Sequence, residues 1–128
     1  MQYKKPENSD KYHWTQHVQT KMLYYGLSSS RVVRILRNPD RLENGIALNT
    51  VAVMQKTGSK AKPQEIWVMY QEKTKGKKQE EKTMDSFSPN LRIIISAWRY
   101  PGISPKNKPL SIPEDVLEDL NNFEMNEQ

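Results

Sequence analysis

The stretch "LRIIISAWRYPG", residues 91–102, has the most regular strand composition in the chain and ends at a Pro-Gly pair. Its β-branched and aromatic residues favour an extended, buried strand. Weaker strand signals occur at residues 41–47, 48–56 and 64–71, and a turn-rich segment separates the last two. We therefore predict an antiparallel sheet of three to four strands, with residues 91–100 as its core-forming strand.

The segment "WTQHVQTKMLYYG", residues 14–26, predicts a short helix before the sheet, because its apolar side chains recur at helical spacing. Thr15 is a candidate N-cap, since its hydroxyl can accept a hydrogen bond from an unpaired backbone N–H, and Asp10 is a competing start. Gly26 suits the left-handed position after a helix, with Leu27 folding back as its hydrophobic partner.

The segment "SSSRVVRILRNPD", residues 28–40, predicts a second helix with Ser28 as its cap. Its apolar residues lie on one side and its three arginines lie off that side. Pro39 disfavours helical geometry at Asn38, so the helix is expected to end there. The order helix, helix, sheet predicts an α+β domain over residues 11–102, with both helices packed on one face of the sheet.

Two segments lie outside this regular pattern. Residues 72–90 have almost no apolar side chains and carry alternating charge runs, so they predict a mobile hairpin loop. Residues 103–128 predict a linker followed by an acidic helix, with Pro113 in its first turn. A helix this short needs a docking surface. Its apolar stripe is Val116, Leu117, Leu120 and Phe123.

The composition excludes several classes of protein and site. The chain of 128 residues has no cysteine, which excludes disulfides, thiolate metal sites and a cysteine nucleophile. The N-terminus lacks the apolar segment of a secretory signal, and no window is long and apolar enough for a membrane span. We therefore expect a cytoplasmic protein that does not act at a membrane.

The charge of the chain is divided unevenly. Residues 1–110 hold all 20 basic and nine acidic residues, a net charge of +11, whereas residues 111–128 hold six acidic and no basic residues, a net charge of −6. A body this basic attracts polyanions, above all nucleic acid, although lysine-rich loops also serve solubility. The acidic tail is a candidate mimic of a polyanion that lies over the basic body.

Two histidines, His13 and His17, lie one helical turn apart in sequence at the start of the first predicted helix. This spacing can hold a metal, but no cysteine and no third nearby ligand supports such a site. We expect no metal and no cofactor. An imidazole exchanges protons near neutral pH, so His17 is a candidate general acid or base, and a hydrogen-bonded structural histidine is the alternative.

Strand alternation sorts the side chains of the sheet onto two faces. The helix-free face is expected to be rich in aromatic side chains, with Arg99 pointing to the opposite, helix side. One interpretation of this face is an open surface for stacking bases and binding phosphates. The other is a face covered by the C-terminal stripe or by another subunit. Its expected members are Trp67, Met69, Arg92, Ser96, Trp98 and Tyr100.

The chain resembles a bacterial domain-of-unknown-function family that is grouped with BrnT-like and RelE-like ribonuclease toxins. The resemblance covers roughly residues 12–102. It rests on a Thr and a His that open the first helix, a basic residue one turn later, a Gly-aliphatic-Ser link, a hydrophobic-basic helix and a closing strand. The positions that carry it are Thr15, His17, Lys21, Gly26, Leu27, Ser28, Val32, Leu36, Pro39 and residues 93–100.

This resemblance implies a RelE-like fold and a toxin-like, RNA-directed domain. Such a domain is expected to act as a metal-independent endoribonuclease, or as a non-catalytic module that binds RNA or protein. RNA, an antitoxin-like protein and a second copy of the chain are the expected partners. The candidate catalytic residues are His17, Arg99 and Tyr100, and the candidate nucleic-acid-binding residues are Lys21, Arg31, Arg34, Arg92, Trp67 and Trp98.

Overall fold

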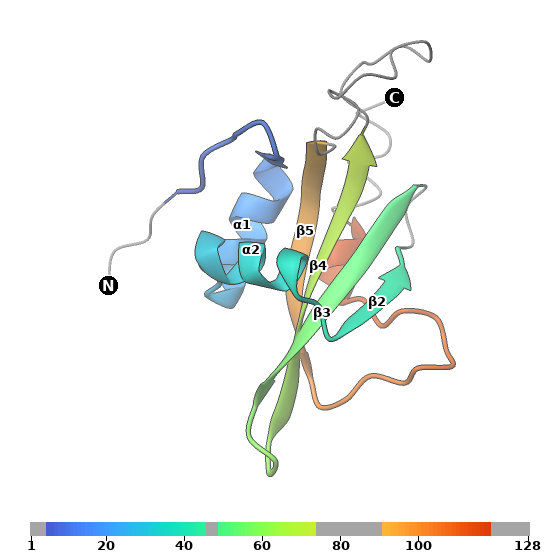
Figure 1. Cartoon of the computed structure of the whole chain (residues 1–128). Helices are drawn as coiled ribbons and strands as arrows, with labels where there is room; N and C mark the ends of the chain where they lie inside the picture. Colours follow the sequence, from blue (N-terminus) through green and yellow to red (C-terminus); the bar gives the residue numbers. More distant parts are fainter. Residues whose placement is uncertain (1–4, 46–48, 74–90, 119–128) are drawn as a thin grey trace.

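A computed structural model describes residues 5–45, 49–73 and 91–118. The helices lie on one face of a five-stranded sheet in the order β1-β5-β4-β3-β2 (Figure 1), which confirms the α+β class. Most of the predicted loop 72–90 lies outside the described residues. The elements are β1 (Tyr12–Trp14), α1 (Gln16–Tyr25), α2 (Ser29–Arg37), β2 (Arg41–Asn44), β3 (Thr50–Gly58), β4 (Pro63–Lys73) and β5 (Leu91–Pro101).

The sheet is mixed, so the prediction of a purely antiparallel sheet of three to four strands is wrong. β1 pairs with β5 in parallel, and the other three strand pairs are antiparallel. β1 has only three residues, too few to show an alternating pattern. It is held from both sides, because Trp14 N donates to Asn8 Oδ1 at 2.7 Å and Arg92 N donates to Lys11 O at 2.9 Å.

The ends of both helices match the signals in the sequence. Thr15 Oγ1 accepts from Val18 N at 3.2 Å at the start of α1, and Ser28 Oγ accepts from Arg31 N at 3.1 Å at the start of α2. Gly26 adopts φ +69°, a conformation that favours glycine. The helix caps therefore come from local sequence alone.

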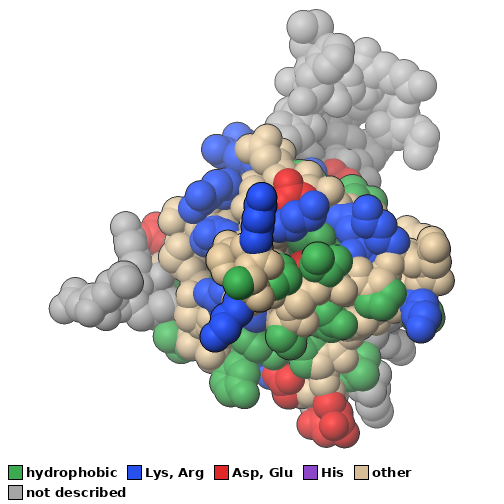
Figure 2. Space-filling model, turned by 90° about the horizontal axis from the view of Figure 1, so that it is seen from below, with side chains coloured by type: hydrophobic (Ala, Val, Ile, Leu, Met, Phe, Trp, Pro, Cys, Tyr) green, Lys and Arg blue, Asp and Glu red, His purple; other side chains and the backbone are tan. Residues whose placement is uncertain are grey.

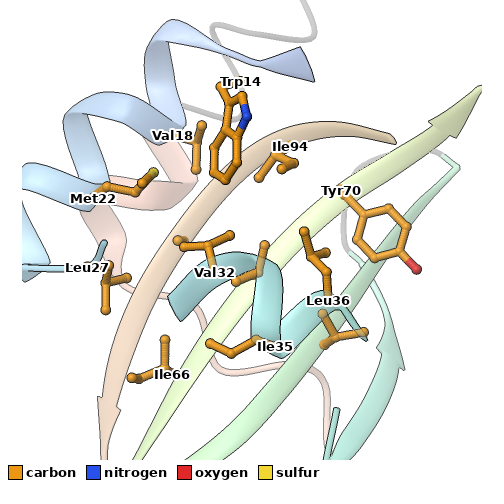
Figure 3. Close-up of a cluster of buried hydrophobic side chains, with 13 residues drawn as sticks. Trp14, Val18, Met22, Leu27, Val32, Ile35, Leu36, Ile66, Tyr70 and Ile94 are labelled. Carbon is orange, nitrogen blue, oxygen red and sulfur yellow. The ribbon is translucent and has the colours of Figure 1, made fainter. Parts of the chain in front are cut away.

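The main hydrophobic core lies between the helices and the sheet. Apolar residues of α1 and α2 point down onto β4 and β5 (Figure 3). Removing this apolar surface from water is the main stabilising term of the fold. The core consists of Trp14, Val18, Met22, Leu27, Val32, Ile35, Leu36, Val53, Ile66, Val68, Tyr70, Ile94 and Ala97.

A second buried cluster lies on the helix-free face. Trp67 and Trp98 are each 0% exposed, and their rings stack with centroids 6.2 Å apart. Val116 of the C-terminal segment is also fully buried in this cluster, and Leu110 and Ile112 pack against it. The face is thus covered by the chain itself. The other cluster members are Ala52, Met54, Met69 and Ile95.

An irregularity in the pairing of β4 with β5 changes which side chains share a face. Met69 is opposite Ser96 and Tyr70 is opposite Ile94, so Ile95 is an extra residue without a partner. An extra residue of this kind shifts the alternation of side chains between the two faces of the sheet, so that residues on its two sides no longer follow one continuous pattern. Ile95 therefore packs in the second cluster and Ile94 in the helix-side core, whereas strict alternation through β5 predicts the opposite faces for these two residues.

The C-terminal segment becomes helical where its acidic residues begin. Residues 114–118 are helical, and Val116 N and Leu117 N both donate to Pro113 O at 3.0 Å. The rest of the predicted acidic helix lies outside the described residues. None of the described helices is long and apolar enough to cross a membrane.

Candidate functional site

One side of α1 carries a row of polar side chains, two of which contact Asp115 of the C-terminal segment. His17, Lys21 and Tyr25 recur every four residues, which places them on one side of the helix. Lys21 is only 8% exposed, and its Nζ lies 2.7 Å from Asp115 Oδ2. The first acidic turn of the tail therefore places a carboxylate on this row, which we call the α1 row.

The Tyr25 hydroxyl also lies near Asp115, 3.4 Å from Oδ1 and 3.5 Å from Oδ2. Burial, followed by the negative charge of Asp115, raises the pKa of Tyr25 to about 12. Both causes disfavour the charged phenolate. At neutral pH the hydroxyl is therefore protonated and acts as a hydrogen-bond donor.

Two of the predicted catalytic residues lie close to this row. Arg99 Nε donates to the backbone oxygen of Tyr25 at 2.7 Å, on the helix side of β5 as predicted. Tyr100 lies on the other face and packs, half-buried, against the second cluster, where Tyr25 also packs. Arg99 therefore contacts the Tyr25 end of the row, whereas Tyr100 lies on the opposite face of the same strand.

The third predicted catalytic residue, His17, is half-buried at the other end of the row. It precedes Tyr25 by eight residues, which corresponds to about 12 Å along a helix axis. The structure therefore gathers Lys21, Tyr25 and Arg99 at one end of α1 and places His17 farther along it.

The arginines predicted to bind nucleic acid occupy three different environments. Arg92 lies on the helix side rather than on the helix-free face, because Ile95 is the extra residue of β5. Its guanidinium is 4.7 Å from the Tyr70 ring centroid and donates to Leu36 O at 3.3 Å. Arg31 is half-buried, and its Nε is buried without a hydrogen-bond partner among the described residues. Arg34 is exposed.

The two tryptophans predicted to stack on bases are not accessible in this structure. Trp67 and Trp98 are covered by Val116 and its neighbours, so neither ring presents a face to solvent. Trp67 Nε1 donates to Glu65 Oε1 at 2.9 Å, whereas Trp98 Nε1 has no hydrogen-bond partner among the described residues. An unpaired buried N–H carries a desolvation cost.

A buried polar cluster, which the sequence did not reveal, holds the linker after β5 against the sheet. Glu65 is 1% exposed and accepts from Ser104 Oγ at 2.7 Å and from Ser104 N at 3.1 Å. Arg41 Nη1 lies 3.8 Å from Glu65 Oε2 and donates to Ser104 Oγ at 2.9 Å. A buried carboxylate requires such partners. This cluster fixes the path of the chain toward Val116.

Tyr25 and Asp115 are the site residues that sequence reasoning missed. Tyr25 is absent from the predicted site residues, although its four-residue spacing from Lys21 is a usable signal. Asp115 is 94 residues from Lys21, so only the folded chain shows that they meet. Within residues 5–45, 49–73 and 91–118, Lys21 and Asp115 form a contact between the acidic tail and a basic residue of the body.

Basic side chains also gather at the end of the molecule where β3 turns into β4. In the view toward this end, Lys and Arg side chains spread over much of the surface and acidic ones lie mainly at its margin (Figure 2). Lys56, Lys60 and Lys62 are exposed in this hairpin.

No group of three or more His, Cys, Asp or Glu within residues 5–45, 49–73 and 91–118 has the arrangement of a metal site.

Comparison of the chain with protein-family models, with curated protein sequences and with solved structures gives no match. The resemblance to BrnT-like and RelE-like toxins therefore stays a prediction from sequence.

Proposed function

We propose that this chain is a toxin-like domain that binds RNA, with the Tyr25 end of the α1 row as a phosphate-contacting site. The observation that carries the proposal is the pair formed by Lys21 and Asp115. A nearly buried ammonium holds an anionic oxygen at 2.7 Å. A phosphate oxygen has the same charge sign and accepts the same hydrogen bond.

The surroundings of Lys21 support an anion at this place. Arg99 is fixed beside the end of α1 by its bond to Tyr25 O, and the Tyr25 hydroxyl is a donor at neutral pH. Two cations and a neutral phenol form a suitable set of donors for a phosphodiester. The overall basic charge of the body would draw a polyanion toward this site over a longer range.

Metal-independent endoribonuclease activity is the second candidate. In this reaction the 2′-hydroxyl oxygen bonds to phosphorus, the 5′-oxygen leaves, and a 2′,3′-cyclic phosphate remains. The protonated Tyr25 is placed to give a proton to the leaving oxygen, and Lys21 and Arg99 to balance the charge on the phosphate. His17, the candidate base, is about 12 Å farther along the helix axis. Binding is therefore favoured over cleavage.

The binding proposal is tested by removing the negative charge of Asp115 from Lys21. Asp115→Asn removes the competing carboxylate charge but leaves Val116 in its buried position, whereas deletion of residues 111–128 would uncover the second cluster. We expect several-fold tighter binding to single-stranded RNA by fluorescence anisotropy. The slope of log K against log salt should steepen by about one phosphate contact, roughly 0.7 for a single strand.

Glu118→Gln is the matched control, because Glu118 is an exposed acid of the same helical segment. It makes the same change in net charge but leaves the pair of Lys21 and Asp115 intact. Equal effects of the two substitutions would mean that only net charge matters. An unchanged RNA affinity in the Asp115→Asn variant would show that Lys21 does not contact the RNA phosphate.

Cleavage is tested separately with purified protein in large excess over RNA. Formation of 2′,3′-cyclic ends that is lost in Tyr25→Phe, with RNA affinity retained, would support the endoribonuclease candidate. Tyr100→Phe and Arg99→Lys test the other two nearby groups in the same assay. If the RNA stays intact but still binds with a steep salt dependence, the endoribonuclease candidate is rejected and the chain acts as a non-catalytic RNA-binding module.

A further inference from the structure

A cleft of about 480 Å³ lies between α2 and the N-terminal segment that leads into β1. It is separate from the α1 row, since its walls come from the other helix and from residues before α1. Its volume is in the range of small-molecule sites. The residues that give it its character are Glu7, Tyr12, Trp14, Val33, Arg34 and Arg37.

The two sides of this cleft have different chemistry. Tyr12 is half-buried, and Trp14, a member of the helix-side core, is 5% exposed with its ring centroid 6.2 Å from that of Tyr12, so Tyr12 presents most of the aromatic surface of one wall. Arg34 and Arg37 are exposed on α2 and three residues apart, which makes them neighbours on the helix surface. Neither guanidinium has an ion-pair partner among the residues that the structure describes.

The aromatic wall is fixed rather than loosely attached. Trp14 N donates to Asn8 Oδ1 at 2.7 Å, and Ser9 N donates to Tyr12 O at 2.9 Å, so the N-terminal segment folds back onto β1. β1 itself is paired with β5. The arginines are carried by a helix packed on the core. A ligand would therefore meet a largely preformed site.

We infer that this cleft binds one nucleotide, with the base against Tyr12 and Trp14 and the phosphate on Arg34 and Arg37. An apolar aromatic wall suits the face of a base. Paired guanidinium groups suit a phosphate, to which arginine donates in bidentate fashion. The acidic Glu7 at the same cleft is a hydrogen-bond acceptor and leaves the site with a net positive charge. The inference deepens the proposed RNA binding, because it adds a site for a single nucleotide.

The probes are nucleoside monophosphates, adenosine and inorganic phosphate, followed by a short single-stranded RNA. The readout is the Trp14 indole N–H signal in NMR spectra of the full chain, assigned with Trp14→Phe. We expect monophosphates to shift this signal and to bind at least tenfold more tightly than adenosine or phosphate alone. A monophosphate that binds no better than inorganic phosphate would overturn the base contact.

The charge contribution is tested with two double substitutions that change net charge equally. Arg34→Gln with Arg37→Gln should weaken monophosphate binding at least tenfold. Lys60→Gln with Lys62→Gln, on the exposed β3–β4 turn, should change it less than twofold. Equal weakening by both pairs, or an unshifted Trp14 signal at millimolar monophosphate, would overturn the site.

The aromatic contribution is tested at Tyr12. Tyr12→Phe keeps the ring and should bind like the parent, whereas Tyr12→Leu should lose several-fold affinity for monophosphate but not for phosphate. The short RNA tests whether the cleft binds a free nucleotide or one residue of an RNA strand. If it binds a residue of RNA, the short RNA should compete with monophosphate for the cleft. Monophosphate binding without competition would reject the link to RNA, independently of the Asp115→Asn result.

Discussion

α1 and α2 cover one face of the sheet, whereas a short stretch around Val116 covers the other. Among residues 5–45, 49–73 and 91–118, the helix-side core has 13 buried members and the second cluster has seven, of which Val116 is the one from the C-terminal segment. The first cover is held mainly by apolar burial. In the described part of the chain, the second cover combines fewer buried apolar residues with polar anchors, among them Glu65 with Ser104 and Lys21 with Asp115. The comparison teaches that polar anchors can hold a covering segment in addition to apolar burial.

The largest effect is expected from breaking the buried anchor of the weaker cover. Glu65→Gln keeps the shape of the side chain but removes the negative charge of the carboxylate that faces Arg41 and accepts hydrogen bonds from Ser104. Removing one partner of a buried pair costs about 3–5 kcal/mol, measured here as the free energy of unfolding in urea. Glu43→Gln, at the half-buried second partner of Arg41, should cost about 1 kcal/mol or less. Equal costs would show that Glu65 is not an anchor.

A pair of equal truncations then compares the two covers directly. Val32 and Val116 are both 0% exposed, one in each cluster. Val32→Ala should cost about 2 kcal/mol of unfolding free energy, from two lost methyl groups and the space they leave. Val116→Ala should cost less than half of that, and should increase proteolysis of the linker after residue 102. Equal losses of unfolding free energy in the two variants, without added proteolysis, would show that the C-terminal segment is packed as firmly as the helices.

The difference between the faces also explains what could be predicted from the sequence. Helix caps at Thr15 and Ser28 and the left-handed Gly26 are local, so short-range chemistry was sufficient. The pairing of β1 and the extra residue Ile95 depend on contacts between distant segments, and neither has a local signature. The sequence left open whether the helix-free face is exposed or covered, and the structure places Val116 of the predicted stripe in the cluster on that face.

The candidate site was less predictable, since its contacts join distant parts of the chain. The helix-side position of Arg99 followed from strand alternation, which held at that end of β5. The same rule failed for Arg92 on the other side of Ile95. The pairing of Lys21 with Asp115 and the burial of Glu65 arise from tertiary folding, where a charged residue finds a partner that sequence spacing does not identify.

A smaller effect is expected at the connection between α1 and β5. Thr15 Oγ1 caps α1 and also donates to Ile94 O at 2.8 Å or Ile95 O at 3.1 Å, which ties the helix to the irregular part of the strand. Thr15→Ala should cost about 1–2 kcal/mol, and Ser28→Ala, which removes an exposed cap alone, about 0.5–1 kcal/mol. Thr15→Ser should restore most of the loss in urea unfolding. Failure of this rescue would mean that the methyl group, rather than the hydroxyl, matters.

The smallest effect concerns the pKa of Tyr25, where the α1 row meets the weaker cover. A pKa raised to about 12 means that the folded state keeps its proton when the unfolded chain, near 10, has lost it. The resulting stabilisation is fully present below pH 10 and is lost as pH rises from about 10 to about 12. Tyrosinate absorbance at 295 nm should therefore show a late step that disappears in Tyr25→Phe.

In the Asp115→Asn variant the midpoint of this late step should fall but stay above 10, because burial, the larger cause, remains while the nearby negative charge is gone. Glu118→Gln should leave the midpoint in place. A midpoint that does not move in Asp115→Asn would show that the tail does not rest on the α1 row in solution. The weaker cover would then be held by Glu65 and Ser104 alone, and the competition between Asp115 and RNA for Lys21 would be rejected with it.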